Sequence, residues 1–236
     1  MNFAVPPPAV RSLAIVDRPD RFAVNRVFCV GRNYAAHVRE MGKDPARDAP
    51  FFFMKPANAV IDAEQPVDIP YPRQTKDYQH EVELVVAIGT GASRIAPEQA
   101  LRHVFGYAVG LDMTRRDLQL AARDKGRPWE FGKSFSPSAP IGALTPIKAA
   151  GHIHDAAITL TVGDQKRQSS NIQQLIWSVA ECIAYLSDYD DLEPGDLIMT
   201  GTPEGVGAVR PGDVMVAEIG GLQPIQVRVS DKGDLK

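Results

Sequence analysis

The sequence is poor in cysteine, and this shortage limits the classes of protein that it can encode. Only Cys29 and Cys182 occur among 236 residues, and they lack the Cys-x-x-Cys spacing of thiol redox motifs. Cys29 lies in an apolar, strand-like run and Cys182 in a helical one, which predicts buried thiols in a reducing compartment. A chain of this length buries roughly 70–75% of its unfolded surface, so it needs no disulfides to fold.

Long apolar runs and an excess of positive charge are also missing. No uninterrupted apolar segment approaches about 18 residues, and the N-terminus has no charged leader followed by an apolar core. We therefore expect a cytoplasmic protein that does not associate with membranes. The net charge is −3, and no basic stripe or lysine-rich tail is present, which argues against nucleic-acid binding.

Motifs for binding nucleotides and calcium are incomplete or absent. The glycine-rich stretch Thr200–Gly207 follows an apolar strand, but no Gly-Lys-Ser/Thr ends it, which argues against a Walker-type nucleotide site. The stretch can still present hydrogen-bond donors to a carboxylate, although Pro203 and Gly205 also fit a plain turn. No Asp-x-Asp-x-Asp-Gly loop with a closing glutamate occurs, which excludes a calcium sensor of the EF-hand type.

The most informative segment that is present runs from Tyr78 to Gly89, where two acids precede an apolar run. Glu81 and Glu83 are two residues apart, and positions two apart in a strand share a face. Both faces become apolar further along, so we expect the strand to carry its acids into the interior. Neighbouring ionised carboxylates in such a place must share a proton, pair with arginine or lysine, or bind a cation.

A third acid occurs in a comparable position, because the apolar run from Val104 to Leu111 ends at Asp112. Three carboxylates, with water completing the shell, suit a hard ion such as Mg²⁺ or Mn²⁺. We predict one such ion per chain, held by Glu81, Glu83 and Asp112. Two alternatives stay open: the Glu-x-Glu pair lies on a solvated strand edge, or the ion is structural in a protein that only binds its ligand.

Strand-like runs outnumber helical ones and do not alternate with them regularly. This pattern argues against a doubly wound sheet and predicts a β-rich α+β fold. Residues 1–25 contain the stiff, extended Pro6–Pro8 and are expected to form an N-terminal arm with short strands, ahead of a single domain over residues 26–236. The predicted strands are Val27–Val30, Phe51–Met54, Val82–Ile88, Val104–Leu111, Ile158–Val162, Leu197–Thr200, Val214–Ile219 and Ile225–Val229.

Two longer helices are predicted from the spacing of apolar residues. The first covers Asn171–Tyr189, with a capping box formed by Ser170 and Gln173 at its start. The second covers about Thr114–Lys125 and ends at Gly126. We expect the few helices of the fold to lie at the periphery of the sheets.

A shorter helix is predicted between Asn33, as its N-cap, and Gly42, as its stop. His37 and Glu40 are three residues apart and therefore share a face of this helix. A histidine paired with a carboxylate can act as a general base, because the acid fixes the tautomer of the ring and raises its basicity. An incidental pair on a surface helix is the alternative, and the spacing alone favours it.

Five segments carry a resemblance to a known family: Cys29–His37, His80–Leu84, Asp112–Asp117, Gly132–Phe135 and Thr200–Gly207. In this order they resemble the signatures of the fumarylacetoacetate hydrolase family. The likeness spans about Val27–Val229 and is greatest to short bacterial members that hydrolyse fumarylpyruvate and other acylpyruvates. It implies the β-roll-like catalytic fold of that family for residues 26–236.

The resemblance also implies roles for the two groups of residues singled out above. Glu81, Glu83 and Asp112 match the family's Mg²⁺ or Mn²⁺ ligands, which agrees with the electrostatic argument. His37 and Glu40 match the pair that activates water, on a segment that orders as a lid in relatives when ligand binds.

Further positions match the part of the family's site that holds substrate. Lys133 matches a lysine near the reacting carbonyl, and the apolar residues before it suggest partial burial. Arg116, Gln119 and Thr202 match positions that contact substrate. Lys55 is a weaker candidate for the border of the same pocket.

The activity that the resemblance implies is hydrolytic cleavage of a carbon–carbon bond in a 1,3-diketo acid, with fumarylpyruvate giving fumarate and pyruvate. Lys133 would stabilise the alkoxide, and Arg116 is the candidate cation for the far carboxylate. An acylpyruvase, an oxaloacetate decarboxylase and an oxo-acid isomerase remain alternatives, because each reaction forms an enolate that the ion stabilises. A metal-stabilised protein that only binds oxo acids is the non-enzyme alternative. Relatives are typically homodimers, so we also expect a homodimer.

Overall fold

Two β-sheets form the body of the structure, a computed structural model that describes residues 2–40 and 48–231. The larger sheet consists of β4 (Phe51–Lys55), β3 (Val27–Gly31), β15 (Leu197–Met199), β8 (Val82–Ile88), β9 (Val104–Leu111), β11 (Ala139–Ile141) and β5 (Val60–Asp62), in this order, with β12 (Thr145–Pro146) paired to β9. The smaller sheet consists of β14 (Gln165–Asn171), β13 (Ala157–Val162), β17 (Val214–Ile219), β18 (Ile225–Ser230) and β6 (Val67–Pro70).

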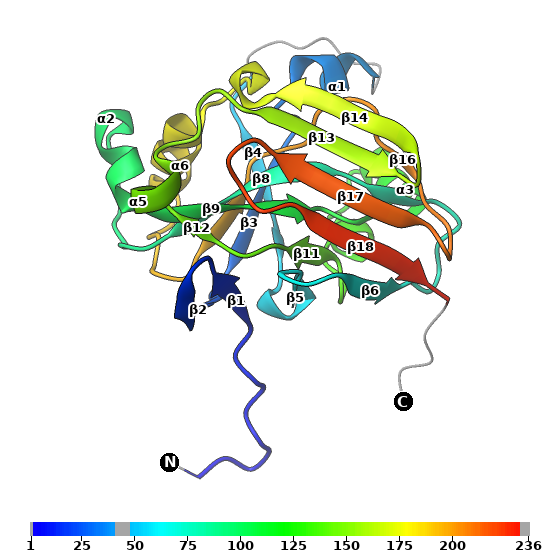
Figure 1. The fold of residues 1–236 in the computed structure, drawn as a ribbon, viewed down its shortest axis with the longest axis horizontal. Helices are drawn as coiled ribbons and strands as arrows, with labels where there is room; N and C mark the ends of the chain where they lie inside the picture. Colours follow the sequence, from blue (N-terminus) through cyan, green and yellow to red (C-terminus); the bar gives the residue numbers. More distant parts are fainter. Residues whose placement is uncertain (1, 41–47, 232–236) are drawn as a thin grey trace.

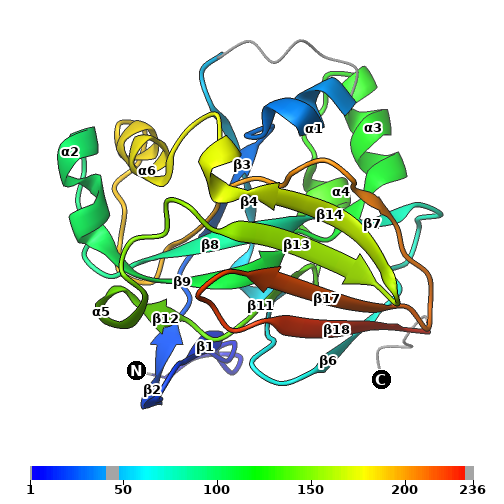
Figure 2. The ribbon, with the colours of Figure 1, turned by 45° about the horizontal axis from the view of Figure 1, so that its top comes forward.

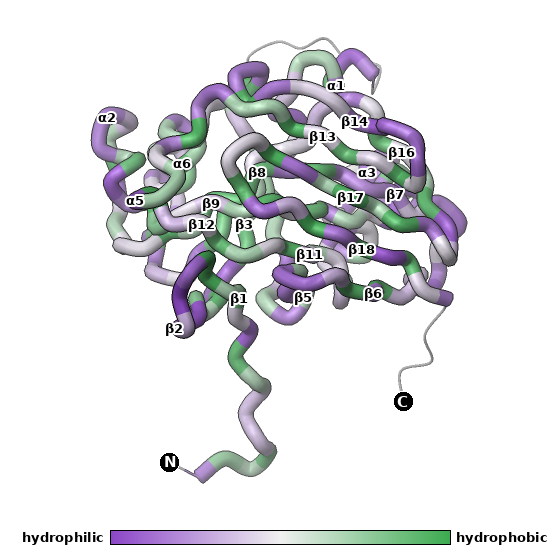
Figure 3. Tube along the Cα trace, in the orientation of Figure 1, coloured by the Kyte–Doolittle hydropathy of each residue, from purple (hydrophilic) through white to green (hydrophobic). Residues whose placement is uncertain are grey.

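The smaller sheet lies over β8 and β9 of the larger one (Figures 1 and 2). Strand β13 contacts β8 and β17 contacts β9, so the main hydrophobic core lies between the two layers. Strand β8 is buried along its whole length, which explains why its sequence is apolar on both faces. Figure 3 shows this apolar character in the central strands and polar residues on the outer elements.

Short elements surround these layers. Further strands form the hairpin β1 (Ser12–Ile15) with β2 (Arg18–Ala23) and a small sheet of β10 (Thr114–Arg115), β7 (Tyr78–His80) and β16 (Gly207–Ala208). The helices are α1 (Ala35–Glu40), α2 (Pro97–Ala100), α3 (Arg116–Asp124), α4 (Glu130–Lys133), α5 (Ile147–Ala150) and α6 (Val179–Ser187), with 3₁₀ turns at Ala57–Ala59, Leu101–His103 and Ile172–Gln174. Helices α2, α5 and α6 gather at one end of the sheets (Figure 2). The predicted β-rich α+β fold with peripheral helices is confirmed.

The β1–β2 hairpin is packed against the larger sheet. Leu13 and Ile15 belong to the same buried cluster as Val27 and Leu197. The division of the chain after residue 25 stays a prediction. No helix within residues 2–40 and 48–231 is long and apolar enough to cross a membrane.

The two cysteines are free thiols in the interior, as predicted. Cys29 lies in β3 and Cys182 in α6, and both side chains are buried. Burial raises the pKa of the Cys29 thiol well above its usual value. The thiol therefore stays protonated and packs as a small apolar group.

The eight predicted strands all coincide with strands of the structure. The short strands β5, β6, β7, β10, β11, β12 and β16 were not predicted, and neither was the longer β14. Its sequence, Gln165–Asn171, is polar, because β14 is an edge strand with only Gln168 buried. The prediction of a helix over Asn171–Tyr189 was wrong in its first half, because the residues after Asn171 form a 3₁₀ turn (Ile172–Gln174) and a loop. Residues up to Asn171 pair with β13, and α6 begins only at Val179.

The capping residues of both longer helices also differ from the prediction. Ser178 and Glu181 form the capping box of α6, whereas Ser170 lies within β14. Helix α3 begins at Arg116, because Thr114 is taken into β10. The predicted end of α3 is confirmed by Gly126, whose φ of 61° suits glycine.

Asn33 does not cap α1 but joins three separate segments. Its side-chain amide donates to the carbonyl oxygens of Thr200 and Trp177, each at 2.9 Å. Its Oδ1 accepts from the backbone N–H of Trp177 at 2.7 Å. Asn33 is 1% exposed, so these bonds replace water for all the groups involved. The predicted stop at Gly42 lies outside the described residues.

This arrangement predicts that Asn33→Ala lowers the free energy of unfolding by about 2–3 kcal/mol, because three buried hydrogen bonds are lost together. Urea denaturation measures the change. Asn58→Ala, at an exposed position, is the matched control and should change stability by less than about 0.5 kcal/mol. Equal effects of the two substitutions would contradict the structural role of Asn33.

Candidate active site

The three predicted metal ligands meet in one buried cluster. A carboxylate oxygen from each of Glu81, Glu83 and Asp112 lies within 4.8 Å of the others. The antiparallel pairing of β8 with β9 brings them together, because Val82 is opposite Leu111 and the next residues outward are therefore neighbours. The backbone N–H of Asp112 donates to the carbonyl oxygen of Glu81 at 2.8 Å.

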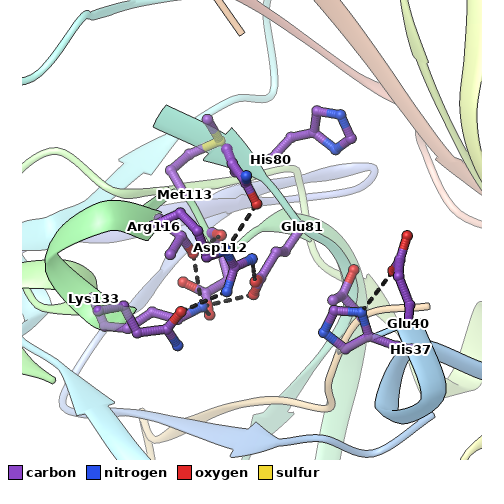
Figure 4. A network of polar contacts seen from close by, with 12 residues as sticks. His37, Glu40, His80, Glu81, Asp112, Met113, Arg116 and Lys133 are labelled. Atoms are coloured by element: carbon purple, nitrogen blue, oxygen red, sulfur yellow. Dashed lines mark hydrogen bonds and ion pairs between the residues drawn. The ribbon is translucent and has the colours of Figure 1, made fainter. Parts of the chain in front are cut away.

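Three cationic side chains converge on this cluster. Lys133 Nζ lies 2.6 Å from both Glu81 Oε2 and Asp112 Oδ2. Arg116 pairs with Glu81 through its Nη2, and Lys55 Nζ lies 2.9 Å from Asp112 Oδ1. Figure 4 shows Lys133 and Arg116 pointing at the two carboxylates from neighbouring elements. The three carboxylates and the three cationic side chains are all buried.

These neighbours shift the pKa values in opposite directions. Burial alone would raise the pKa of Glu81, but the positive charges of Lys133 and Arg116 outweigh burial and lower it. Burial raises the pKa of Glu83 well above its usual value, and the charges of Asp112 and Glu81 raise it further. Burial would lower the pKa of Lys133, but the neighbouring carboxylates outweigh this effect and raise it.

Glu83 therefore marks the point of the cluster that lacks positive charge. Its Oε2 accepts from the backbone N–H of Gly201 at 2.8 Å. Within the described part of the chain, no lysine or arginine nitrogen lies within ion-pair distance of this carboxylate. The oxygen-only donor set and this local excess of negative charge both fit a hard divalent ion. Glu81, Glu83 and Asp112 could together hold such an ion.

The predicted pair on α1 is present and faces the same cleft. His37 Nδ1 lies 3.2 Å from Glu40 Oε2. The backbone N–H of Gly205 donates to both carboxylate oxygens of Glu40, at 3.1 and 3.2 Å, which ties α1 to the glycine-rich loop. His37 is buried and lines the cleft together with the carboxylates. Figure 4 shows the pair lying beside the acidic cluster.

The cleft has an empty volume of about 560 Å³. Its buried lining includes the acidic cluster, His37 and Thr202, whereas its partly exposed lining includes Arg32, Arg123 and Trp129. Thr202 Oγ1 accepts from the side-chain amide of Gln168 at 2.8 Å. The buried interior of the cleft thus holds the three carboxylates together with Arg116 and Lys133, whereas its more exposed border carries the basic side chains of Arg32 and Arg123.

Arg116 and Gln119 lie together, as their helical spacing predicted, but their polar atoms face protein partners. Arg116 donates through Nε to Gln79 Oε1 at 2.8 Å and through Nη1 to Gln119 Oε1 at 2.5 Å. Its Nη2 is paired with Glu81. Each nitrogen of the guanidinium therefore has a partner, and Arg116 orients Glu81. The role of Arg116 and Gln119 in substrate contact stays a prediction.

Lys55, which the sequence ranked below Lys133, lies at the carboxylate cluster rather than in the lining of the cleft, and two other polar residues were missed. Lys55 is completely buried at the end of β4, and besides Asp112 it donates to Ser138 Oγ at 2.9 Å. The sequence signal for its burial was its position directly after the apolar run Phe51–Met54. Thr114 Oγ1 accepts from Lys133 Nζ at 2.7 Å, although the sequence suggested only a helix cap.

Gln168 is the second residue that the sequence gave no reason to select, because it stands in a polar edge strand. Besides Thr202, its amide nitrogen donates to the carbonyl oxygen of Pro203 at 2.8 Å. Its Oε1 lies 2.9 Å from His80 Nδ1 and accepts from the backbone N–H of Val82 at 3.1 Å. Gln168 thereby links the smaller sheet to the segments on either side of Glu81 and to the glycine-rich loop.

The combination of this fold with a buried carboxylate cluster and a histidine–glutamate pair agrees with known proteins. Residues 26–230 match the family described as fumarylacetoacetate (FAA) hydrolase C-terminal. The chain therefore belongs to the fumarylacetoacetate hydrolase family, as the sequence motifs predicted.

Individual members of the family are similar over most of their length. A fumarylpyruvate hydrolase from Ralstonia sp. is 45% identical over 186 residues, which cover 79% of this chain and 95% of the relative. The mitochondrial oxaloacetate tautomerase of Homo sapiens is 38% identical over 203 residues, covering 86% of this chain and 90% of the relative. The crystal structure of fumarylpyruvate hydrolase from Pseudomonas aeruginosa, in complex with Mn²⁺ and pyruvate, has a TM-score of 0.93 at 56% identity and covers 97% of this chain and 99% of that chain.

The geometry predicts that a divalent ion stabilises the folded protein. Mn²⁺ at about 1,000 times its Kd should raise the free energy of unfolding by about 4 kcal/mol, because only the folded state assembles the three carboxylates. Glu83→Gln should abolish most of this gain. Thermal unfolding with added Mn²⁺ and with chelator measures both effects, and Glu64→Gln, at an exposed position, is the control.

Glu83→Gln should also stabilise the metal-free protein, as measured in the presence of chelator. The folded state raises the pKa of Glu83, so the folded state binds the proton more tightly than the unfolded state does. Stability in chelator should therefore fall as the pH rises above the ordinary range of a glutamate, and Glu83→Gln should reduce this fall. An unchanged pH profile in Glu83→Gln would contradict the assigned repulsion.

Proposed function

We propose that this protein is a metal-dependent hydrolase that cleaves a carbon–carbon bond in a 1,3-diketo acid, converting fumarylpyruvate and water to fumarate and pyruvate. One observation carries the proposal: a buried cluster of three carboxylates lines the same cleft as His37, whose ring is hydrogen-bonded to Glu40 behind it. The similarity to fumarylpyruvate hydrolases, one of them in complex with Mn²⁺ and pyruvate, supports this substrate.

Glu81, Glu83 and Asp112 would hold Mg²⁺ or Mn²⁺ in the interior of the cleft. When bound, the ion supplies a Lewis acid that polarises the 2-oxo acid end of the substrate and offsets the negative charge of the departing enolate. Arg116 and Lys55 fix the orientation of Glu81 and Asp112 through their ion pairs.

His37 would act as the general base that activates water. Glu40 Oε2 lies beside His37 Nδ1 and accepts its proton in a hydrogen bond, which leaves Nε2 as the free acceptor. The N–H of Gly205 holds Glu40 in place, so the tautomer is fixed before substrate arrives. Nε2 then takes a proton from the water that attacks the distal carbonyl carbon.

Lys133 would stabilise the alkoxide that this attack produces. The three N–H groups of its ammonium already reach Glu81, Asp112 and Thr114, so Lys133 would act on the alkoxide through its positive charge, which burial strengthens. When the alkoxide collapses, the carbon–carbon bond breaks, and the electron pair leaves with the pyruvate fragment as its enolate. The proton held on His37 then passes to the terminal carbon of the enolate, which gives pyruvate and balances the reaction. Gln119 and Thr202 would contact the substrate from the walls of the cleft.

Cleavage of other acylpyruvates, decarboxylation of oxaloacetate and tautomerisation or isomerisation of oxo acids use the same enolate chemistry. The similarity to the human oxaloacetate tautomerase favours oxaloacetate as a second substrate of this site. We also propose a cytoplasmic location, on the basis of composition, and a homodimer, on the basis of family membership.

Turnover of fumarylpyruvate, acetylpyruvate and oxaloacetate by the Mn²⁺-loaded protein tests the proposal directly. Fumarylpyruvate should give the highest kcat/KM, with fumarate and pyruvate formed in equal amounts. Binding of these acids without turnover would instead identify an oxo-acid-binding protein. Faster conversion of oxaloacetate than of fumarylpyruvate would identify oxaloacetate as the preferred substrate and contradict the proposed one.

His37→Ala should lower kcat by about 10²- to 10⁴-fold, because the general base is removed. Calorimetry should find unchanged affinity for Mn²⁺, since the three carboxylates do not depend on this ring. His154→Ala, at an exposed position, is the matched control. A His37→Ala protein with normal turnover would exclude the proposed water activation.

A further inference from the structure

Arg32 lines the cleft but has no role in the mechanism proposed above. It stands between β3 and α1, with the left-handed backbone angle φ of 59°. This conformation is uncommon for an arginine. It is held between two elements of the site, because Cys29–Gly31 lie in the larger sheet and the residues after Arg32 lead into the helix of His37.

The guanidinium of Arg32 has an aromatic neighbour and, among the described residues, no acidic one. Its Cζ lies 5.3 Å from the ring centroid of Phe51, which supports the flat face of the group. Within residues 2–40 and 48–231, no carboxylate lies within ion-pair distance of Arg32. A partly buried arginine stacked on a ring, with its donors unused by acids, is suited to bind a carboxylate bidentately.

A second arginine adds positive charge to the same border of the cleft. Arg123, near the end of α3, lines the cleft and is partly exposed. Its Nη2 lies 2.8 Å from Asp124 Oδ1, a pair between sequence neighbours that leaves its other amino nitrogen available. Burial lowers the pKa of Arg32, and the charge of Arg123 lowers it further. An anion between the two arginines would relieve this repulsion.

A dicarboxylic diketo acid has a second carboxylate, far from its oxo-acid end, and this group needs a cationic partner. Arg116, the cation that the sequence suggested for it, already pairs with Glu81 and donates to Gln79 and Gln119. Moving Arg116 to the substrate would leave Glu81, a candidate metal ligand, short of a buried partner. Arg32 has no carboxylate partner among the described residues, so it can bind the substrate without breaking an ion pair.

We propose that Arg32, assisted by Arg123, binds the far carboxylate of the substrate and makes the protein selective for diketo acids that carry an acid group at both ends. The inference rests on the proposed function, since it assigns the second end of that substrate. Trp129 also lines the cleft and offers a flat surface for a conjugated acyl chain. The buried carboxylates, through their ion, and the basic border would thus bind opposite ends of one molecule.

Selectivity between fumarylpyruvate and acetylpyruvate tests the assignment, because acetylpyruvate lacks the far carboxylate. In Arg32→Gln, the ratio of kcat/KM for fumarylpyruvate to that for acetylpyruvate should fall about 10- to 100-fold, mainly through KM for fumarylpyruvate. Arg123→Gln should lower the same ratio by a smaller factor. Arg228→Gln, on the exposed side of β18, is the matched control and should leave the ratio unchanged.

An equal loss for both substrates, or an unchanged ratio, in Arg32→Gln would overturn the assignment of Arg32 without contradicting the proposed hydrolase function. If Arg32→Gln does not fold, the ratio in Arg123→Gln decides, since α3 is away from the strained backbone of residue 32. Calorimetric binding of fumarate to the Mn²⁺-loaded protein separates the inference from the proposed function. Weaker fumarate binding in Arg32→Gln supports the subsite even without turnover, and equal or absent binding in both proteins overturns it.

Discussion

The repulsion among three buried carboxylates is the constraint on which the site depends. Glu81, Glu83 and Asp112 are held together by the pairing of β8 with β9, and neither strand can shift without exposing its apolar side chains. The cluster is tolerable because Lys133 and Arg116 deliver positive charge from the helical segments that cover it. Glu83 lacks such a partner, so its carboxylate must take up either a proton or a cation, and a divalent ion would replace that proton.

The cleft holds its three carboxylates in the interior and two further arginines at its border, and the proposed substrate orientation rests on this arrangement. The buried acids would reach the substrate's oxo-acid end only through a cation, whereas the border arginines would bind an acid group directly. His37 lies on a short helix between these regions and is held by Glu40, whose own anchor is the glycine-rich loop. Electrostatic preorganisation of this kind is the main source of catalytic power in many enzymes.

Much of the architecture followed from local patterns. The run Val82–Ile88 is apolar on both faces and could only be a central strand, and Val104–Leu111 is similar. Periodicity failed over Asn171–Tyr189, because apolar residues at helical spacing there belong to a turn and a loop before α6 begins at Val179. The edge strand β14 was missed because it is polar, although its buried Gln168 connects two layers of the site.

The sequence by itself determined the pair Glu81 and Glu83 at the head of a buried strand and the helical spacing of His37 and Glu40, because both relations extend over less than one turn or one pleat. Only the tertiary structure decided that Asp112 joins the pair, that Arg116 is committed to Glu81, and that Arg32 faces the cleft. These contacts join residues far apart in the chain, and their geometry depends on strand register and helix packing, which no local spacing encodes.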